Sequence, residues 1–292
     1  MDVSVPGFDL RERLGRSLFA RVAGPDGPEK RARIHGTPGP RWFVPGSAIR
    51  TVHGDASMFV GGLRALLLQS LHPLAMAAVA AHSGYRGDPW GRVQRTSTFL
   101  AVTTFGTADD AQRAVDRVRT VHERVRGVTA TGAAYHASDP HLLGWVHVAE
   151  VDSFLTAHQC YGAHPLDRAG CDAYVADTAR VAAALGVIDP PRDRAELADR
   201  LTSYRHELRA TRDARDAARF LLHEPPLPRT ARAPYAILAA NAVSTLPRWA
   251  CESLDLPCLR GVERKAVRMT GQALIGTIRW ALGPPPPARV SE

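Results

Sequence analysis

Apolar residues recur at helical spacing along most of the chain, and the clearest case is the segment 107–127. Its apolar stripe consists of Ala111, Val115, Val118, His122 and Val125. Spacings of four and three residues place these side chains on one face of a helix. Thr107 is placed as the N-cap and Gly127 as the C-terminal stop. The pattern therefore predicts an amphipathic helix with a histidine on the face that should be buried.

The same spacing, with cap residues and prolines at helix starts, predicts helices through nearly the whole chain. They are expected near residues 10–22, 56–82, 89–105, 140–161, 167–185, 194–222, 235–246 and 260–282. The dipeptide His72-Pro73 predicts a kink or break in the second of these. Residues 23–54 are rich in glycine and proline and predict a long ordered arm or loop. The sequence shows no alternating strand pattern of useful length and no internal repeat.

These elements predict an all-α protein built as a single large multi-helix domain over residues 55–282. An N-terminal helix and the Gly/Pro-rich arm precede the domain at 1–54, and a flexible proline-rich tail follows it at 283–292. A chain of 292 residues with 45% hydrophobic content is long and apolar enough to bury such a core.

The net charge of +8 is carried almost entirely by arginine, since Lys30 and Lys265 are the only lysines. The arginines alternate with acidic residues along predicted helices, which is typical of solvated helix faces. A long basic block or a basic pattern interleaved with aromatic residues is missing from the sequence. The charge therefore does not favour a nucleic-acid partner.

The four cysteines form no CxxC pair and no CxxCH motif, which argues against a zinc ribbon and against covalent haem attachment. The N-terminus lacks a basic-then-apolar signal pattern. The longest apolar stretch, 58–81, is interrupted by Arg64, Gln69, His72 and Pro73, which favours a buried core helix over a transmembrane span. A cytoplasmic location is expected.

A buried histidine such as His122 needs a partner, because a bare polar group inside a protein costs free energy. A backbone carbonyl or a buried water would satisfy it, and so would a metal ion. On the preceding helix, Arg92, Arg95 and Thr96 can share one face. This group fits either a lined pocket, where arginines would meet carboxylates such as haem propionates, or an ordinary solvated helix face.

His147 lies beside another apolar stripe, with Glu150 one turn later. His147 and His122 would flank one face of a cofactor, or His122, His147 and Glu150 would together hold a non-haem iron. The chain contains no HExxH or ExxH motif, so neither a zincin nor a ferritin-like di-iron site is indicated. His72 and His82 add imidazoles on a third helix.

The elements LQ-x-LHP, HSGYRGDPWGRVQRT, FGT, a helix ending HERVRG, and YHASDPHLLGWVHV occur in this order. They resemble the family of rubber oxygenase (latex-clearing protein) and the mycophenolic-acid-pathway oxygenase MpaB, over roughly residues 54–161 and more weakly beyond. The resemblance implies an all-α fold with globin-like packing of helices around non-covalent haem b. It also implies activation of O2 and oxidative cleavage of an alkene. With the buried His122 and the face of Arg92, Arg95 and Thr96, it leads us to expect a haem-dependent oxygenase or peroxygenase. Such an enzyme would use O2 or peroxide on a small or medium apolar substrate, with C=C cleavage as one outcome and an unidentified electron donor.

By the same resemblance, His122 is the expected iron ligand, and Arg92, Arg95 and Thr96 lie on the other face of the haem. His147 is expected near the haem as a supporting residue. Latex-clearing protein has a lysine where this chain has Arg95, which stays protonated and is no normal iron ligand. The face of the haem opposite His122, the distal face, is therefore expected to be open, to hold water, or to receive a hydrogen bond from arginine.

Latex-clearing protein also carries a glutamate base in the preceding helix, whereas residues 58–81 contain no Asp or Glu. His72 and His82 are the titratable groups nearby, so Arg95, Thr96 and His72 are the expected catalytic side chains. Two other functions stay open at this point. One is a non-catalytic helical protein that binds haem or another ligand, and the other is a non-haem metalloenzyme with histidine and carboxylate ligands.

Overall fold

The computed structural model describes residues 6–84 and 86–283. The first helices are α1 (Pro6–Ala23), α2 (Gly27–Gly36), α3 (Ala48–His53), α4 (Met58–Gln69), α5 (Pro73–His82), α6 (Pro89–Phe105) and α7 (Ala108–Arg124). A hairpin of β1 (Arg126–Val128) and β2 (Ala134–His136) follows. The remaining helices are α8 (Pro140–Tyr161), α9 (Arg168–Leu185), α10 (Arg194–Ser203), the short 3-10 helix η1 (Tyr204–His206), α11 (Arg212–His223), α12 (Arg229–Ser244), α13 (Arg248–Ser253) and α14 (Gly261–Leu282).

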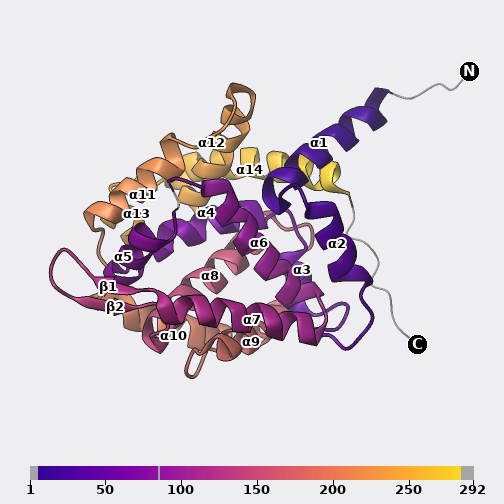
Figure 1. Cartoon of the computed structure of the whole chain (residues 1–292). Coiled ribbons are helices and arrows are strands. Elements are labelled where there is room, and N and C mark those ends of the chain that lie inside the picture. The colour runs from indigo at the N-terminus through magenta and orange to yellow at the C-terminus, as the bar shows by residue number, and fades with distance from the viewer. Residues whose placement is uncertain (1–5, 85, 284–292) are drawn as a thin grey trace, which may run out of the picture.

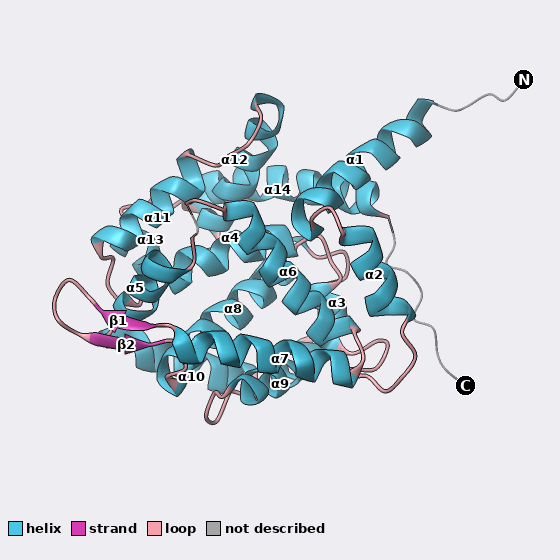
Figure 2. Cartoon of the chain, in the orientation of Figure 1, coloured by secondary structure: helices cyan, strands magenta, loops and turns pink. Residues whose placement is uncertain are grey.

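The centre of the molecule is the pair α4 and α8, which pack against each other more extensively than any other two elements. In Figure 1, α1, α12 and α14 lie along the top and α7 and α9 along the bottom, with α8 between them. Figure 2 shows that the hairpin is a small appendage at one end of an otherwise helical structure. The prediction of an all-α single domain is confirmed.

The long arm predicted over 23–54 is wrong in part, because it contains α2 and α3. Both are short, and short helices depend on tertiary contacts rather than on their own propensity. In α3, Ile49 and Val52 are fully buried, and the backbone N–H of Ile49 donates to Asp177 Oδ2 over 3.1 Å. Such support comes from α9 and leaves no periodic signal in the local sequence.

The break predicted at His72-Pro73 is confirmed. Helices α4 and α5 are separate and bend by 109° relative to each other. In the described chain, no single helix is long and apolar enough to cross a membrane. Helices α4 and α5 together have the required length and apolar composition, but the bend separates them. The helix predicted over 194–222 is also divided, since η1 and an irregular segment separate α10 from α11.

The hairpin was not predicted, because its strands have three residues each and no alternating pattern. It pairs Arg126 with His136 and Gly127 with Tyr135. Gly127 is therefore a strand residue and not a helix stop, and α7 already ends at Arg124. A Cβ atom on Gly127 would lie 2.7 Å from Tyr135 Cζ, so the Tyr135 ring, which packs over Gly127, leaves no room there for a side chain. The predicted tail lies, apart from Gly283, outside the described residues.

Three apolar clusters hold the helices together. The first surrounds Trp145 and joins α4 to α8, α11 and α13; the second surrounds Tyr174 on α9; the third surrounds Ile275 on α14. Among the described residues, none of these clusters includes a residue of α7, and α6 contributes only Leu100. Helices α6 and α7 therefore lie largely outside these three clusters, although Val102, Ala111 and Val115 on them are buried.

Candidate functional site

Helix α7 forms as its sequence predicts. Thr107 is the N-cap, and its hydroxyl oxygen accepts a hydrogen bond of 3.2 Å from the Asp110 N–H. Ala111 and Val115 at the start of the stripe are fully buried. His122, two turns later, is half-buried on the same stripe. The arginines of the helix are exposed, as expected for the opposite face.

The His122 imidazole has no hydrogen-bond partner in the described structure. Its Nδ1 atom is buried and unpaired. Burial lowers the pKa of His122, so the ring is neutral at physiological pH. A neutral imidazole with a free nitrogen is the form that binds a metal ion.

Helix α8 contributes a second unpaired histidine and a carboxyl group. The Nε2 atom of His147 is buried without a partner, and burial, aided by the charge of Arg200, lowers the pKa of His147 to about 4. One turn later, burial raises the pKa of Glu150 to about 7. Glu150 makes no hydrogen bond or ion pair, although it keeps some accessible surface. Glu150 is thus a desolvated acid without a counterion.

The raised pKa of Glu150 makes protein stability depend on pH. The carboxyl group has an ordinary pKa of 4.5 when unfolded and about 7 when folded, so the folded state disfavours its charged form. Stability is therefore lost as the pH rises through this interval, by at most about 3 kcal/mol. We expect the free energy of unfolding of the wild type to fall relative to Glu150→Gln between about pH 5 and pH 8. Urea unfolding at several pH values measures this, and parallel pH profiles of the two proteins would contradict it.

The arginines of the predicted pocket lie at the start of α6. Asp88 caps this helix, accepting from the Gly91 N–H over 2.8 Å and from Arg95 Nη1 over 3.2 Å. The Arg95 side chain is 63% exposed, and Thr96 is also exposed. Arg92 is half-buried. The three residues share the first turns of α6, so an anion that binds Arg95 must compete with Asp88 for the guanidinium.

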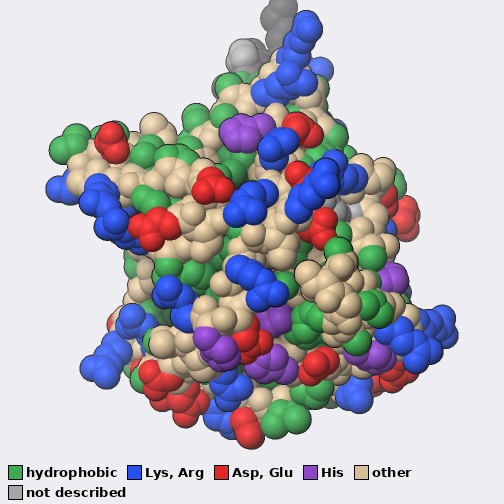
Figure 3. Space-filling view, turned by 90° about the vertical axis from the view of Figure 1, so that its left-hand side faces the viewer, with side chains coloured by type: hydrophobic (Ala, Val, Ile, Leu, Met, Phe, Trp, Pro, Cys, Tyr) green, Lys and Arg blue, Asp and Glu red, His purple; other side chains and the backbone are tan. Residues whose placement is uncertain are grey.

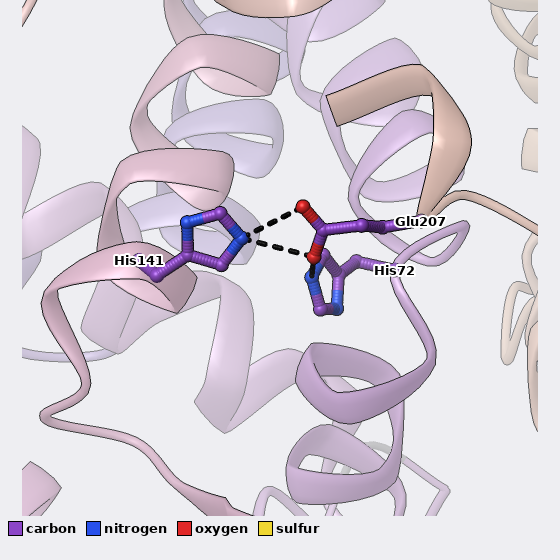
Figure 4. A group of neighbouring side chains, drawn as sticks. All are labelled: His72, His141 and Glu207. Carbon is purple, nitrogen blue, oxygen red and sulfur yellow. Dashed lines mark hydrogen bonds and ion pairs between the residues drawn. The ribbon is translucent and has the colours of Figure 1, made fainter. Parts of the chain in front are cut away.

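His72 belongs to a different group of side chains, shown in Figure 4. Its Nε2 atom lies 3.3 Å from Glu207 Oε2, and His141 Nε2 lies 2.9 Å from each oxygen of the same carboxylate. Burial lowers the pKa of His72, although the negative charge of Glu207 opposes this effect. His82 makes a separate contact of 3.2 Å with the Tyr135 hydroxyl.

The hypothesis of a non-haem site formed by His122, His147 and Glu150 is not supported by the geometry. Within the described residues, the one group of three or more potential ligands that converge within 4.8 Å consists of His72, His141 and Glu207. The reason is positional, because α8 packs mainly on α4 and α9, whereas α7 packs on α6 and α9.

The sequence reasoning missed several polar residues near the candidate site. His53 contacts Thr104 Oγ1 over 2.8 Å and the Tyr174 hydroxyl over 3.2 Å, and burial lowers the pKa of His53 to about 3. Glu150 is close enough to raise the pKa of Tyr174 further, beyond the effect of burial. These residues come from α3, α6, α8 and α9, and no local spacing could have joined them. His141 was recognisable only as a histidine four residues before Trp145, and Glu207 only as an isolated acid.

Comparison with known proteins supplies the family. A sequence model for the ER-bound oxygenase mpaB/B′/Rubber oxygenase catalytic domain matches residues 50–280. Uncharacterized proteins of Mycobacterium bovis and Mycobacterium tuberculosis are each 35% identical to the chain over 100 residues, or 34% of it. The matched segment spans 38% of the length of those relatives. No solved structure gives a significant match.

The matched region begins in α3 and ends in α14, and it includes the helices that carry His122, His147 and Arg95. It covers well over half of the chain. The chain belongs to the family of mpaB-type oxygenases and rubber oxygenases, as a form of their catalytic domain.

Proposed function

We propose that the protein is a haem b-dependent oxygenase that uses O2 or peroxide to oxidise a small or medium apolar substrate. The observation that carries the proposal is the His122 imidazole, which is neutral, half-buried and without a partner on the inner face of α7. Family membership supports an oxygenase, and the unpaired imidazole supports a metal-containing cofactor held at this helix.

The residues present fit haem in three respects. The unpaired atoms His122 Nδ1 and His147 Nε2 leave polar groups inside the protein that nothing else satisfies. The apolar stripe of α7 is fully buried at Ala111 and Val115 but only partly buried at Val118 and Val125, so a flat apolar cofactor has surface to cover near His122. Arg92, half-buried on α6, supplies a cation for a propionate group.

In the proposed reaction, His122 holds the cofactor through a ring nitrogen. The bound haem would supply the iron that activates O2 or peroxide. Arg95 and Thr96 are assigned to the distal face, where the guanidinium donates hydrogen bonds and cannot itself accept a proton at neutral pH. His147 borders the site as a neutral, buried imidazole.

Glu150 replaces the base that is missing from α4 and α5. It is the unpaired carboxyl group of the site, and a pKa of about 7 keeps both its acid and its base form populated at neutral pH. We assign to its carboxylate oxygens the transfer of a proton to or from the substrate or the oxidant. This assignment replaces the sequence-based hypothesis that His72 serves in that role, because His72 instead contacts Glu207.

The absorption spectrum of the freshly purified protein tests the proposal. We expect a Soret band and about one haem per chain, as measured by pyridine haemochrome assay, with consumption of O2 or peroxide in the presence of an apolar alkene. A colourless protein that rejects added haem would exclude haem chemistry. A haem protein that is inert toward both oxidants yet binds an apolar ligand would favour the non-catalytic alternative.

Replacing Arg95 with lysine tests the assignment of the distal face. A lysine amine loses its proton when desolvated and then becomes a nitrogen ligand, which arginine does not. We expect Arg95→Lys to shift toward a low-spin spectrum at alkaline pH, whereas Arg113→Lys, an exposed change on α7, has no effect. Identical spectra of Arg95→Lys and wild type over the whole pH range would place Arg95 outside the pocket.

A further inference from the structure

A second cluster of side chains lies apart from the proposed haem site. His72 stands at the bend between α4 and α5, His141 in the first turn of α8, and Glu207 directly after η1. His141 precedes His147 by six residues, which corresponds to about 9 Å along α8 and to another side of the helix. In Figure 3, which shows the face that carries the hairpin, most of the visible histidine side chains lie in the lower half, with acidic side chains among them.

From this cluster we infer that His72, His141 and Glu207 form a binding site for a divalent transition-metal ion such as Zn²⁺. The structure holds two imidazole Nε2 atoms and a carboxylate whose ligand atoms all lie within 4.8 Å of one another. Two histidines and one carboxylate are a common ligand set for zinc and for non-haem iron(II). The set leaves coordination positions open for water or a small ligand.

The distances agree with a shared ion. Ligand atoms bound to one metal at about 2.1 Å lie about 2.9–3.4 Å apart in octahedral or tetrahedral geometry. The contacts of Glu207 with the two imidazoles are 2.9 and 3.3 Å. His141 Nε2 is equally distant from both carboxylate oxygens, so a single N–H is shared between them in a bifurcated hydrogen bond, which leaves neither contact linear.

Contacts outside the cluster hold the three ligands in place. The backbone N–H of Arg209 donates to the Leu71 carbonyl over 2.9 Å, which fixes the segment of Glu207 beside His72. The Tyr204 hydroxyl donates to the His141 carbonyl over 2.8 Å. Trp145 Nε1 donates to the Gln69 carbonyl over 3.1 Å and so ties α8 to the end of α4. The site is therefore preorganised by the fold, which lowers the entropic cost of binding.

Access and charge also suit a cation. His72 is 2% exposed and anchors the inner side, whereas the His141 side chain is 53% exposed and opens the site to solvent. Two neutral imidazoles and one carboxylate carry a net charge of −1. The second ring nitrogen of His72, Nδ1, has no acceptor in the described structure. Because a metal-binding histidine normally donates this hydrogen, we expect an affinity roughly 10–100-fold weaker than that of a site in which both histidines make this hydrogen bond.

Isothermal titration of the chelator-treated full chain with Zn²⁺, and separately with Mg²⁺, tests the inference. We expect one Zn²⁺ per chain and no binding of Mg²⁺, which prefers oxygen ligands. His141→Ala and Glu207→Ala should each weaken Zn²⁺ binding by about tenfold or more. His206→Ala is the matched control, because His206 lies 3.7 Å from Glu207 but its side chain is 78% exposed.

Zn²⁺ should also raise the melting temperature of the wild type and of His206→Ala, but not that of His141→Ala. The same Zn²⁺ affinity is expected for His122→Ala, so failure of the haem proposal leaves this inference standing. If the wild type binds no Zn²⁺, or if His206→Ala weakens binding as much as His141→Ala does, the inference is overturned. Glu207 would then be a hydrogen-bond acceptor that joins the start of α5, through His72, to the start of α8, through His141.

Discussion

Replacing His122 with alanine is expected to abolish the retention of haem while leaving the helical fold intact. The substitution removes the one ring proposed to hold the cofactor. Among the described residues, His122 belongs to no group of three potential metal ligands that could replace it. Because His122 is only half-buried, the cavity it leaves should cost about 1–3 kcal/mol. Removal of its unpaired Nδ1 atom offsets part of that cost.

Haem content per chain, measured by pyridine haemochrome assay after gel filtration, quantifies this effect. Circular dichroism of the same samples reports whether the fold persists. Thr120→Ala is the matched control, because Thr120 is an exposed residue on the same helix. Full haem occupancy of His122→Ala with an unchanged spectrum would exclude His122 as the ligand. Haem loss together with loss of helical content would instead assign His122 a structural role.

Removing the carboxyl group of Asp152 is expected to cause a large loss of stability, although Asp152 lies outside the proposed site. Arg64 on α4 is almost fully buried, and its Nη2 atom lies 2.7 Å from Asp152 Oδ2 on α8. Arg64 also donates to Ser153 Oγ and to the Thr245 carbonyl. Without Asp152 the guanidinium keeps these two hydrogen bonds but is left as a buried charge without a counterion.

We therefore expect Asp152→Ala to lower the free energy of unfolding by about 3 kcal/mol, a large fraction of a typical total of about 5–15 kcal/mol. Urea unfolding measures the change. Asp199→Ala, which removes an exposed carboxylate on α10, should have little effect. The double variant Arg64→Met/Asp152→Leu should regain much of the stability, since apolar residues of similar volume can replace a buried ion pair. Equal stability of Asp152→Ala and Asp199→Ala would show that solvent reaches Arg64.

Most long helices could be predicted from the sequence, because their signals are local. In α7, the Thr107 cap and the periodic stripe lie within the helix itself, and the same holds for Asp139 and Pro140 at the start of α8. The elements that were missed are short. Helix α3 and the hairpin are stabilised by partners distant in sequence, namely Asp177 for Ile49 of α3 and His82 of α5 for Tyr135 of β2.

The same distinction between local signals and distant partners applies to the candidate site. The sequence by itself determined that His122 lies on the inward face of a helix, because helical periodicity fixes the side on which a residue lies. It also determined that Arg92, Arg95 and Thr96 share the first turns of α6. It could not determine which ring nitrogens lack a partner, since that depends on what other helices bring near them.

Only the tertiary structure decided the roles that depend on distance. It placed His72 beside His141 and Glu207, which are 69 and 135 residues away along the chain. It enclosed Glu150 without a counterion, and this desolvation raises its pKa to about 7. Burial and electrostatic environment are sums over residues from many elements, so they exist only after the chain has folded.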